Sequence, residues 1–160
     1  MKKLLLIRHS KATHESGFDD FERPLTHSGM QDAALMAERL KARSVIPELL
    51  VSSPALRTLS TANIFSQHFP IPKAQTVKAI YDASETTLLQ VINEFPDDAN
   101  FIGLVGHNPG ISQILYYLTG SVHDMDTSGV ALIEFKADSW AEVSGDTGKL
   151  ISYDSPKILA

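Results

Sequence analysis

Short apolar runs that end abruptly in polar residues recur along this chain, and they constrain its fold more than any other feature. Three such runs cover residues 4–7, 49–51 and 101–105. Runs of this length are typical of strands that are buried on both faces of a parallel sheet. Between them lie longer segments with apolar residues three or four apart, as in amphipathic helices. The alternation predicts an α/β domain, a three-layer α/β/α sandwich around a mostly parallel central sheet.

Cap residues and prolines delimit the expected helices. Thr26 is well placed as the N-cap of the first helix. Ser53-Pro54 and Asn108-Pro109 each combine a cap residue with a proline suited to the first helical position. A further helix is expected around residues 88–95, and Gly120 is placed to end the last helix.

The last part of the chain has a different pattern. Residues 130–135 and 149–153 are expected to be strands, separated by a turn at Ser144-Gly145-Asp146. A turn between two neighbouring strands favours antiparallel pairing. We therefore expect an antiparallel pair at the edge of the sheet.

Composition excludes several classes of function. The 160 residues are 43% hydrophobic, enough for one core, so residues 1–160 are expected to form a single domain and a monomer. The formal charge of -5 is spread along the chain without a basic block, which gives nucleic acid and anionic membranes nothing to bind. The absence of cysteine excludes disulfides, a thiolate nucleophile and cysteine-ligated metals. The apolar run near the N-terminus is too short for a signal peptide, so a cytoplasmic protein without membrane segments is expected.

Polar residues, among them two histidines and two arginines, follow the three predicted buried strands. The first strand ends in Arg8-His9, the second is followed by Ser53 and then Arg57, and the third by Gly106-His107-Asn108. Ligands of parallel α/β sheets gather at the carboxyl ends of the strands. These segments are therefore expected to meet and to form an anion pocket with two histidines and two arginines.

This set of residue types suits phosphoryl transfer. The reaction spreads negative charge over the equatorial phosphate oxygens and needs fixed positive donors around them. Arginine binds two oxygens at once and keeps its proton at working pH. Nearby arginines also disfavour protonation of an imidazole, which must be neutral to act as a nucleophile.

Four motifs in this order resemble those of the histidine phosphatase superfamily. Leu6-Ile7-Arg8-His9 is similar to its Arg-His signature, and Arg23-Pro24-Leu25-Thr26-His27-Ser28-Gly29 to its Pro-Leu-Thr-x-x-Gly segment. Residues 53–62 resemble its Ser-x-x-x-Arg-x-x-x-Thr-Ala segment, and residues 106–110 supply the later Gly-His. The short chain and the Gly-His-Asn-Pro-Gly run resemble the SixA-type phosphohistidine phosphatases within the superfamily.

The resemblance implies a phosphoglycerate mutase-like fold and a metal-independent phosphatase without a cofactor. It implies His9 as the nucleophile, Arg8 and Arg57 as phosphate clamps, His107 as the second catalytic histidine, and Arg23 as a further phosphate contact. The implied reaction is hydrolysis of phosphohistidine on a protein partner, through a covalent phosphohistidine intermediate on His9. A small phosphate ester as substrate, or a non-catalytic phosphate-binding module, is the alternative.

The chain departs from the superfamily motifs at Ser10, and the sequence leaves the roles of some residues open. Ser10 stands where the superfamily usually has glycine, so the nucleophile loop is expected to be tighter or differently hydrogen-bonded. Arg23 could instead form an ion pair with Asp19, Asp20 or Glu22. Asp82 is the candidate general acid, with Glu85 as the alternative. An alkoxide leaving group needs such an acid, whereas an imidazole leaving group is readily protonated.

Overall fold

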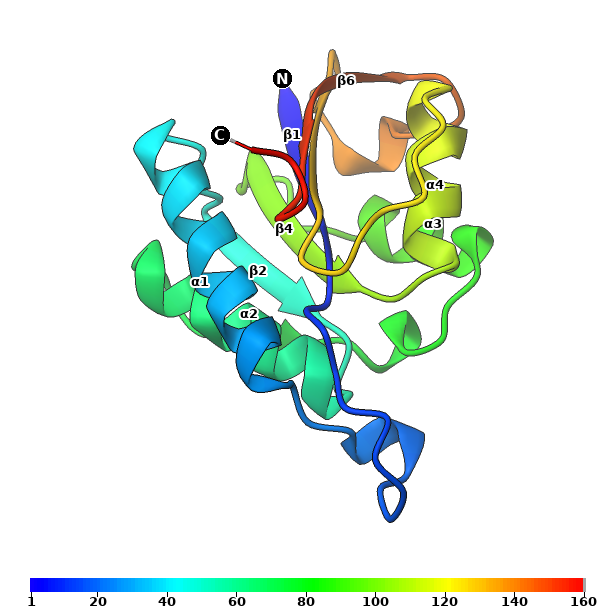
Figure 1. Ribbon diagram of the computed structural model, residues 1–160. Helices are drawn as coiled ribbons and strands as arrows, with labels where there is room; N and C mark the ends of the chain where they lie inside the picture. The colour runs from blue at the N-terminus through cyan, green and yellow to red at the C-terminus, as the bar shows by residue number, and fades with distance from the viewer. Residues whose placement is uncertain (160) are drawn as a thin grey trace.

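A six-stranded sheet forms the centre of the computed structural model, which describes residues 1–159 (Figure 1). The strand order is β3-β2-β4-β1-β5-β6. The strands are β1 (Lys2–Arg8), β2 (Leu49–Ser52), β3 (Gln75–Thr76), β4 (Phe101–Gly106), β5 (Val130–Phe135) and β6 (Gly148–Asp154). Strands β1 to β4 pair in parallel, while β5 is antiparallel to β1 and β6 is antiparallel to β5. The predicted mostly parallel sheet and the antiparallel pairing of the last two strands are confirmed. Of these two strands, β6 lies at the edge and β5 lies between β1 and β6.

Two helices cover each face of the sheet (Figure 1). Helices α1 (His27–Ala42) and α2 (Leu56–His68) pack on one face, and α3 (Glu85–Asn93) and α4 (Gly110–Thr119) on the other. Alternation along β1 explains the two layers of core, since Leu5 and Ile7 join the α1 and α2 side whereas Leu4 and Leu6 join the opposite side. Within residues 1–159, no helix combines the length and the apolar character needed to cross a membrane.

The helix ends agree with the sequence at two places and differ at three others. Thr26 caps α1, where its hydroxyl oxygen accepts a hydrogen bond from the Gly29 N–H at 3.0 Å. Gly120 ends α4 in the left-handed conformation, at a φ of 76°. The prediction that Ser53 is an N-cap was wrong, because α2 begins only at Leu56 and the Ser53 hydroxyl is turned toward another side chain, described below.

The start of α4 is also displaced from the prediction. This helix begins at Gly110, so its N-cap position is Pro109 and not Asn108. Asn108 still binds the first turn, because its side-chain oxygen accepts a hydrogen bond from the Ser112 N–H at 3.3 Å. The helix expected around residues 88–95 starts earlier, after a hydrogen-bonded Ser84 cap.

The carboxyl ends of the three central strands are level with one another. Arg8 of β1 pairs with Gly106 of β4, and Ser52 of β2 pairs with Val105 of the same strand. The ladder continues one residue beyond β1, because the His9 N–H donates to the Gly106 carbonyl at 3.1 Å. This register therefore sets the backbone positions of Arg8 and His9 independently of their side-chain contacts.

Candidate active site

A cavity of about 540 Å³ lies at the carboxyl ends of β1, β2 and β4. It is lined by all six residues that the sequence singled out for the site: Arg8, His9, Arg23, Arg57, Asp82 and His107. Six further residues complete the lining: Lys11, Ala12, His14, Asp20, Asn108 and Thr127. The expected meeting of the strand ends is therefore observed, and the lining extends beyond the two histidines and two arginines.

The His9 ring is held in one tautomer by the backbone. Its Nδ1 lies 2.7 Å from the Ser10 carbonyl oxygen. Because a carbonyl can only accept, Nδ1 must carry the ring proton, and Nε2 keeps its lone pair when the ring is neutral. Burial lowers the pKa of His9 to about 4, and the positive charges of Arg57 and Arg8 act in the same direction. At neutral pH, His9 therefore presents an unprotonated Nε2.

His107 is the second buried imidazole of the cavity. Its ring centroid lies 5.4 Å from that of His9, and its Nε2 lies 2.8 Å from the Ser53 hydroxyl oxygen. Burial lowers the pKa of His107 to about 3, with a further contribution from Arg57. Its Nδ1 is buried without a hydrogen-bond partner among the described residues.

The two predicted clamp arginines are held by contacts with different segments of the chain. Arg8 donates through Nη1 to the Met125 carbonyl oxygen at 2.7 Å. Arg57 is only 6% exposed and forms an ion pair with Asp20, with 3.0 Å between Nη2 and Oδ2. In both guanidinium groups the buried Nε lacks a partner within the described part of the chain. Both arginines line the cavity, where a guanidinium group suits an anion.

Asp20 is a site residue whose importance the sequence did not reveal. It begins the short 3-10 helix η1 (Asp20–Glu22), and its carboxylate binds Arg57, Arg23 and the Tyr81 hydroxyl. The hydrogen bond from Tyr81 and the arginine charges lower the pKa of Asp20 to about 2. The ion pair considered for Arg23 is present, at 3.2 Å from Asp20, and Arg23 also lines the cavity. The only signal in the sequence was that Asp20 lies close to Arg23 along the chain. Its contacts with Arg57 and Tyr81 depend on tertiary structure.

Three hydroxyl groups hold the loop that follows His9. The Ser10 hydroxyl forms a hydrogen bond of 2.5 Å with the Ser128 hydroxyl, and both residues are fully buried. The Ser10 N–H donates to the Thr61 hydroxyl oxygen at 2.9 Å, and Thr61 in turn donates to the Arg57 carbonyl. The different hydrogen bonding expected for Ser10 is thus found. It connects the candidate nucleophile loop directly to the helix that carries Arg57.

The Pro-Leu-Thr-x-x-Gly segment also contacts the loop that follows His9. The Thr26 N–H donates to the Lys11 carbonyl at 2.9 Å, and Ala12 forms an isolated antiparallel bridge with Leu25. A Cβ atom at Gly29 would overlap the Lys11 carbonyl oxygen. Glycine is therefore required where α1 approaches the loop, a role beyond the helix capping that the sequence indicated.

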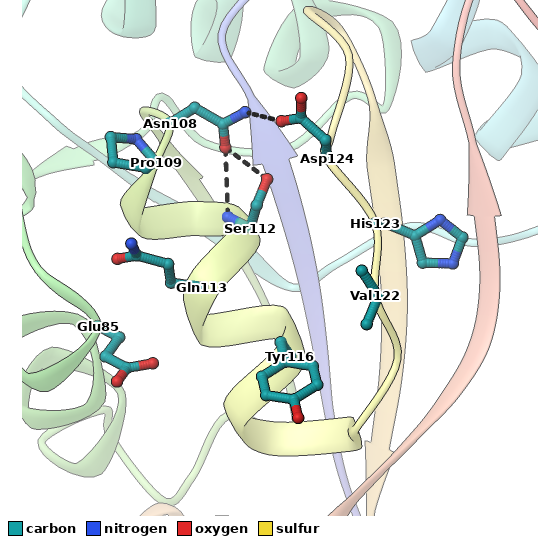
Figure 2. Close-up of a pocket in the computed structure, with 9 residues that line it drawn as sticks. All are labelled: Glu85, Asn108, Pro109, Ser112, Gln113, Tyr116, Val122, His123 and Asp124. Atoms are coloured by element: carbon teal, nitrogen blue, oxygen red, sulfur yellow. Dashed lines mark hydrogen bonds between the residues drawn. The ribbon is translucent and has the colours of Figure 1, made fainter.

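The two carboxylates considered as general acid are separated by the fold. Asp82 lines the cavity, whereas Glu85 lines a different groove alongside α4 (Figure 2). The alternative assignment to Glu85 is therefore not supported by its position. Of the other histidines, His14 is exposed at the cavity wall, which its sequence context did not indicate.

Comparison with known proteins finds both a family model and solved structures that are similar to this chain. Residues 4–78 match the sequence model of the histidine phosphatase superfamily, branch 1. The crystal structure of SixA from Agrobacterium tumefaciens, which is described as a phosphohistidine phosphatase, is similar to this chain with a TM-score of 0.80. The two sequences are 27% identical, and the match covers 97% of this chain and 98% of that one.

Two uncharacterized proteins are similar in sequence along most of the chain. A chloroplast protein of Arabidopsis thaliana is 28% identical over 92% of this chain and 72% of its own length. A protein of Mycobacterium tuberculosis is 26% identical over 94% of this chain and 100% of its own length. Together with the fold shared with the SixA structure, the superfamily match over residues 4–78 supports a phosphatase of the histidine phosphatase superfamily that is similar to the SixA type.

Proposed function

We propose that this protein hydrolyses phosphohistidine on a protein partner through a covalent phosphoryl intermediate on His9. One observation carries the proposal: the His9 ring donates from Nδ1 to the Ser10 carbonyl and is neutral at pH 7, so an unprotonated Nε2 remains beside the guanidinium groups of the cavity. A neutral imidazole nitrogen with fixed cations around it is what an in-line attack on a phosphoryl group requires.

In the first step, the Nε2 lone pair of His9 forms a bond to phosphorus as the phosphorus–nitrogen bond of the substrate breaks. The electron pair of that bond stays on the substrate nitrogen, and the substrate ring leaves neutral when its other nitrogen carries a proton. Arg8 and Arg57 neutralise the charge on the equatorial oxygens. The His107 ring and the guanidinium of Arg23 complete the proposed contacts to phosphate.

In the second step, water attacks the phosphorus atom of phospho-His9 and the bond to Nε2 breaks. The electron pair returns to Nε2, and both protons of the water leave with the released phosphate. His9 thereby regains its starting state, with the proton on Nδ1 still donated to the Ser10 carbonyl oxygen. The proposed cycle uses no metal and no cofactor.

Hydrolysis of a small phosphate ester is the second candidate, and the position of Asp82 is the observation that favours it. An alkoxide leaves poorly without a proton, and Asp82 is a carboxyl in the lining of the cavity that could supply one. Phosphohistidine does not need this group, because its imidazole leaving group is protonated readily. The two substrates therefore differ in their dependence on Asp82.

The test compares turnover of a phosphohistidine-bearing carrier protein and of a panel of phosphate esters, without added metal, by wild type, His9→Ala and Asp82→Asn. The proposal expects strong carrier activity that His9→Ala abolishes and Asp82→Asn leaves nearly intact. Acid-labile, base-stable radiolabel should be trapped on His9 after quenching. Faster ester turnover that is lost in Asp82→Asn would replace the proposal by the ester reaction. Binding of phosphate without any turnover would indicate a binding module instead.

A further inference from the structure

An open groove of about 690 Å³ runs alongside α4 and is separate from the His9 cavity (Figure 2). We call it the α4 groove; the lining residues used below are Glu85, Asn108, Ser112, Tyr116, Val122 and Asp124. It is larger than the cavity of about 540 Å³, and the proposed chemistry makes no use of it.

The α4 groove and the cavity share one wall. Asn108 lines both of them, and its side chain is fixed by hydrogen bonds from Nδ2 to Asp124 at 3.0 Å and to the Met125 carbonyl at 3.2 Å. On the other side, its Oδ1 accepts from the Ser112 hydroxyl at 2.6 Å. The same Met125 carbonyl accepts from Arg8. A molecule whose phosphoryl group enters the cavity can therefore extend directly across Asn108 into the groove.

The walls of the α4 groove expose large apolar side chains. Tyr116 projects from α4 and Val122 from the segment that follows it (Figure 2), and they are 56% and 81% exposed. Apolar side chains gathered in a groove beside a reactive site are a feature of surfaces that bind another macromolecule. A small phosphate ester that fills the cavity would leave both side chains in water.

Charge distinguishes the groove from the cavity. The groove carries the carboxylates of Glu85 and Asp124, on opposite sides of α4 in Figure 2, and neither forms an ion pair with any of residues 1–159. The cavity carries the cationic groups of Arg8, Arg23 and Arg57. The complementary ligand is anionic at one end and apolar with basic groups at the other.

We propose that the α4 groove binds the phosphohistidine-bearing protein itself, through a helix whose apolar side chains are flanked by lysine or arginine next to the phosphohistidine. An amphipathic helix that lies in an apolar groove is a common mode of protein recognition. Asn108 separates the two parts of the bound partner, with the phosphoryl group on the His9 side and the helix on the Tyr116 side. This inference rests on the proposed function.

A second apolar surface flanks the cavity and serves as the matched comparison. It includes Phe18, Phe21 and Leu56 around a hollow of about 450 Å³. It shares no lining residue with the cavity, and its one charged lining residue is Glu22. Because continuity with the cavity and the carboxylates on either side of α4 are features of the α4 groove alone, the observations favour that groove.

The test uses two substrates with the same leaving group: a phosphohistidine-bearing carrier protein and the free amino acid phosphohistidine. Tyr116→Ser and Val122→Lys alter the groove, and Phe18→Ser is the matched control on the other surface. For the carrier, we expect both groove variants to raise KM about tenfold with kcat nearly unchanged, as for loss of a central apolar contact. Turnover of free phosphohistidine should stay at the wild-type rate in all three variants, which also reports correct folding.

The outcomes separate this inference from the proposed function. If wild type hydrolyses the carrier and the groove variants keep its KM, the docking site is wrong and the reaction stands. A rise of KM in Phe18→Ser alone would transfer docking to the other surface and would also overturn the inference. Failure of wild type to hydrolyse the carrier would remove the proposed function and, with it, the docked partner.

Discussion

The two buried histidines should make the stability of this protein sensitive to mild acid. In the unfolded chain each imidazole ionises near its ordinary pKa of about 6.5. Folding lowers the pKa of His9 to about 4 and that of His107 to about 3, mainly through burial. Between pH 6.5 and 4, the unfolded chain therefore binds protons that the folded chain does not. The free energy of unfolding must fall as the pH is lowered through this window.

The size of the effect follows from these pKa values. Each histidine costs about 1.4 kcal/mol per pH unit below 6.5, which amounts to about 2 kcal/mol between pH 7 and pH 5. The two together give about 4 kcal/mol, a large part of the ~5–15 kcal/mol that stabilises a typical domain. Asp20 also stabilises the folded state less in acid, but with its pKa lowered to about 2 it acts mainly below pH 4, so pH 5 isolates the histidines.

The assay is urea unfolding at pH 7 and at pH 5 for wild type, His9→Asn and His107→Gln. Asparagine keeps an N–H near the position of Nδ1, which faces the Ser10 carbonyl, and glutamine keeps a polar group near Nε2, which faces Ser53. Each variant should lose about half of the wild-type pH dependence. Equal unfolding free energies of wild type at the two pH values would refute the neutral, buried state of these rings, and with it the basis for an unprotonated Nε2.

Three further substitutions test other parts of the site. Asp20→Asn should strengthen binding of inorganic phosphate about fivefold by calorimetry, since a partly exposed ion pair of about 1 kcal/mol with Arg57 no longer competes; weaker binding would mean that the carboxylate mainly orients the arginine. Ser128→Ala should lower the free energy of urea unfolding by about 1–2 kcal/mol, because the buried Ser10 hydroxyl loses its partner, and an unchanged value would contradict this. Gly29→Ala should cost about 1–3 kcal/mol in thermal unfolding, because its Cβ overlaps a backbone carbonyl; wild-type stability would show that the loop yields freely.

Local patterns were sufficient for the layers of the fold and for the principal site residues. Strands buried on both faces are apolar throughout, so β1, β2 and β4 stand out in the sequence without knowledge of their partners. The carboxyl ends of parallel strands meet at one edge of the sheet. His9 and His107 could therefore be placed together, although they lie 98 positions apart in the sequence (107 − 9 = 98).

Helix starts were predicted less well, because cap residues have more than one use. Ser53 has the side chain of an N-cap, but in the folded chain its hydroxyl lies against His107. The edge position of β6 and the interior position of β5 were likewise not readable from the sequence, since either strand could have paired with β1.

The sequence by itself determined which chemical groups are available: two histidines and two arginines, each at the end of a strand or in the first turn of a helix. The tertiary structure alone decided their state. Burial makes both imidazoles neutral, the Ser10 carbonyl selects the His9 tautomer, and Asp20 reaches Arg57 from a segment 37 residues away. These are properties of dielectric surroundings and of distances in space, which exist only after distant segments have packed together.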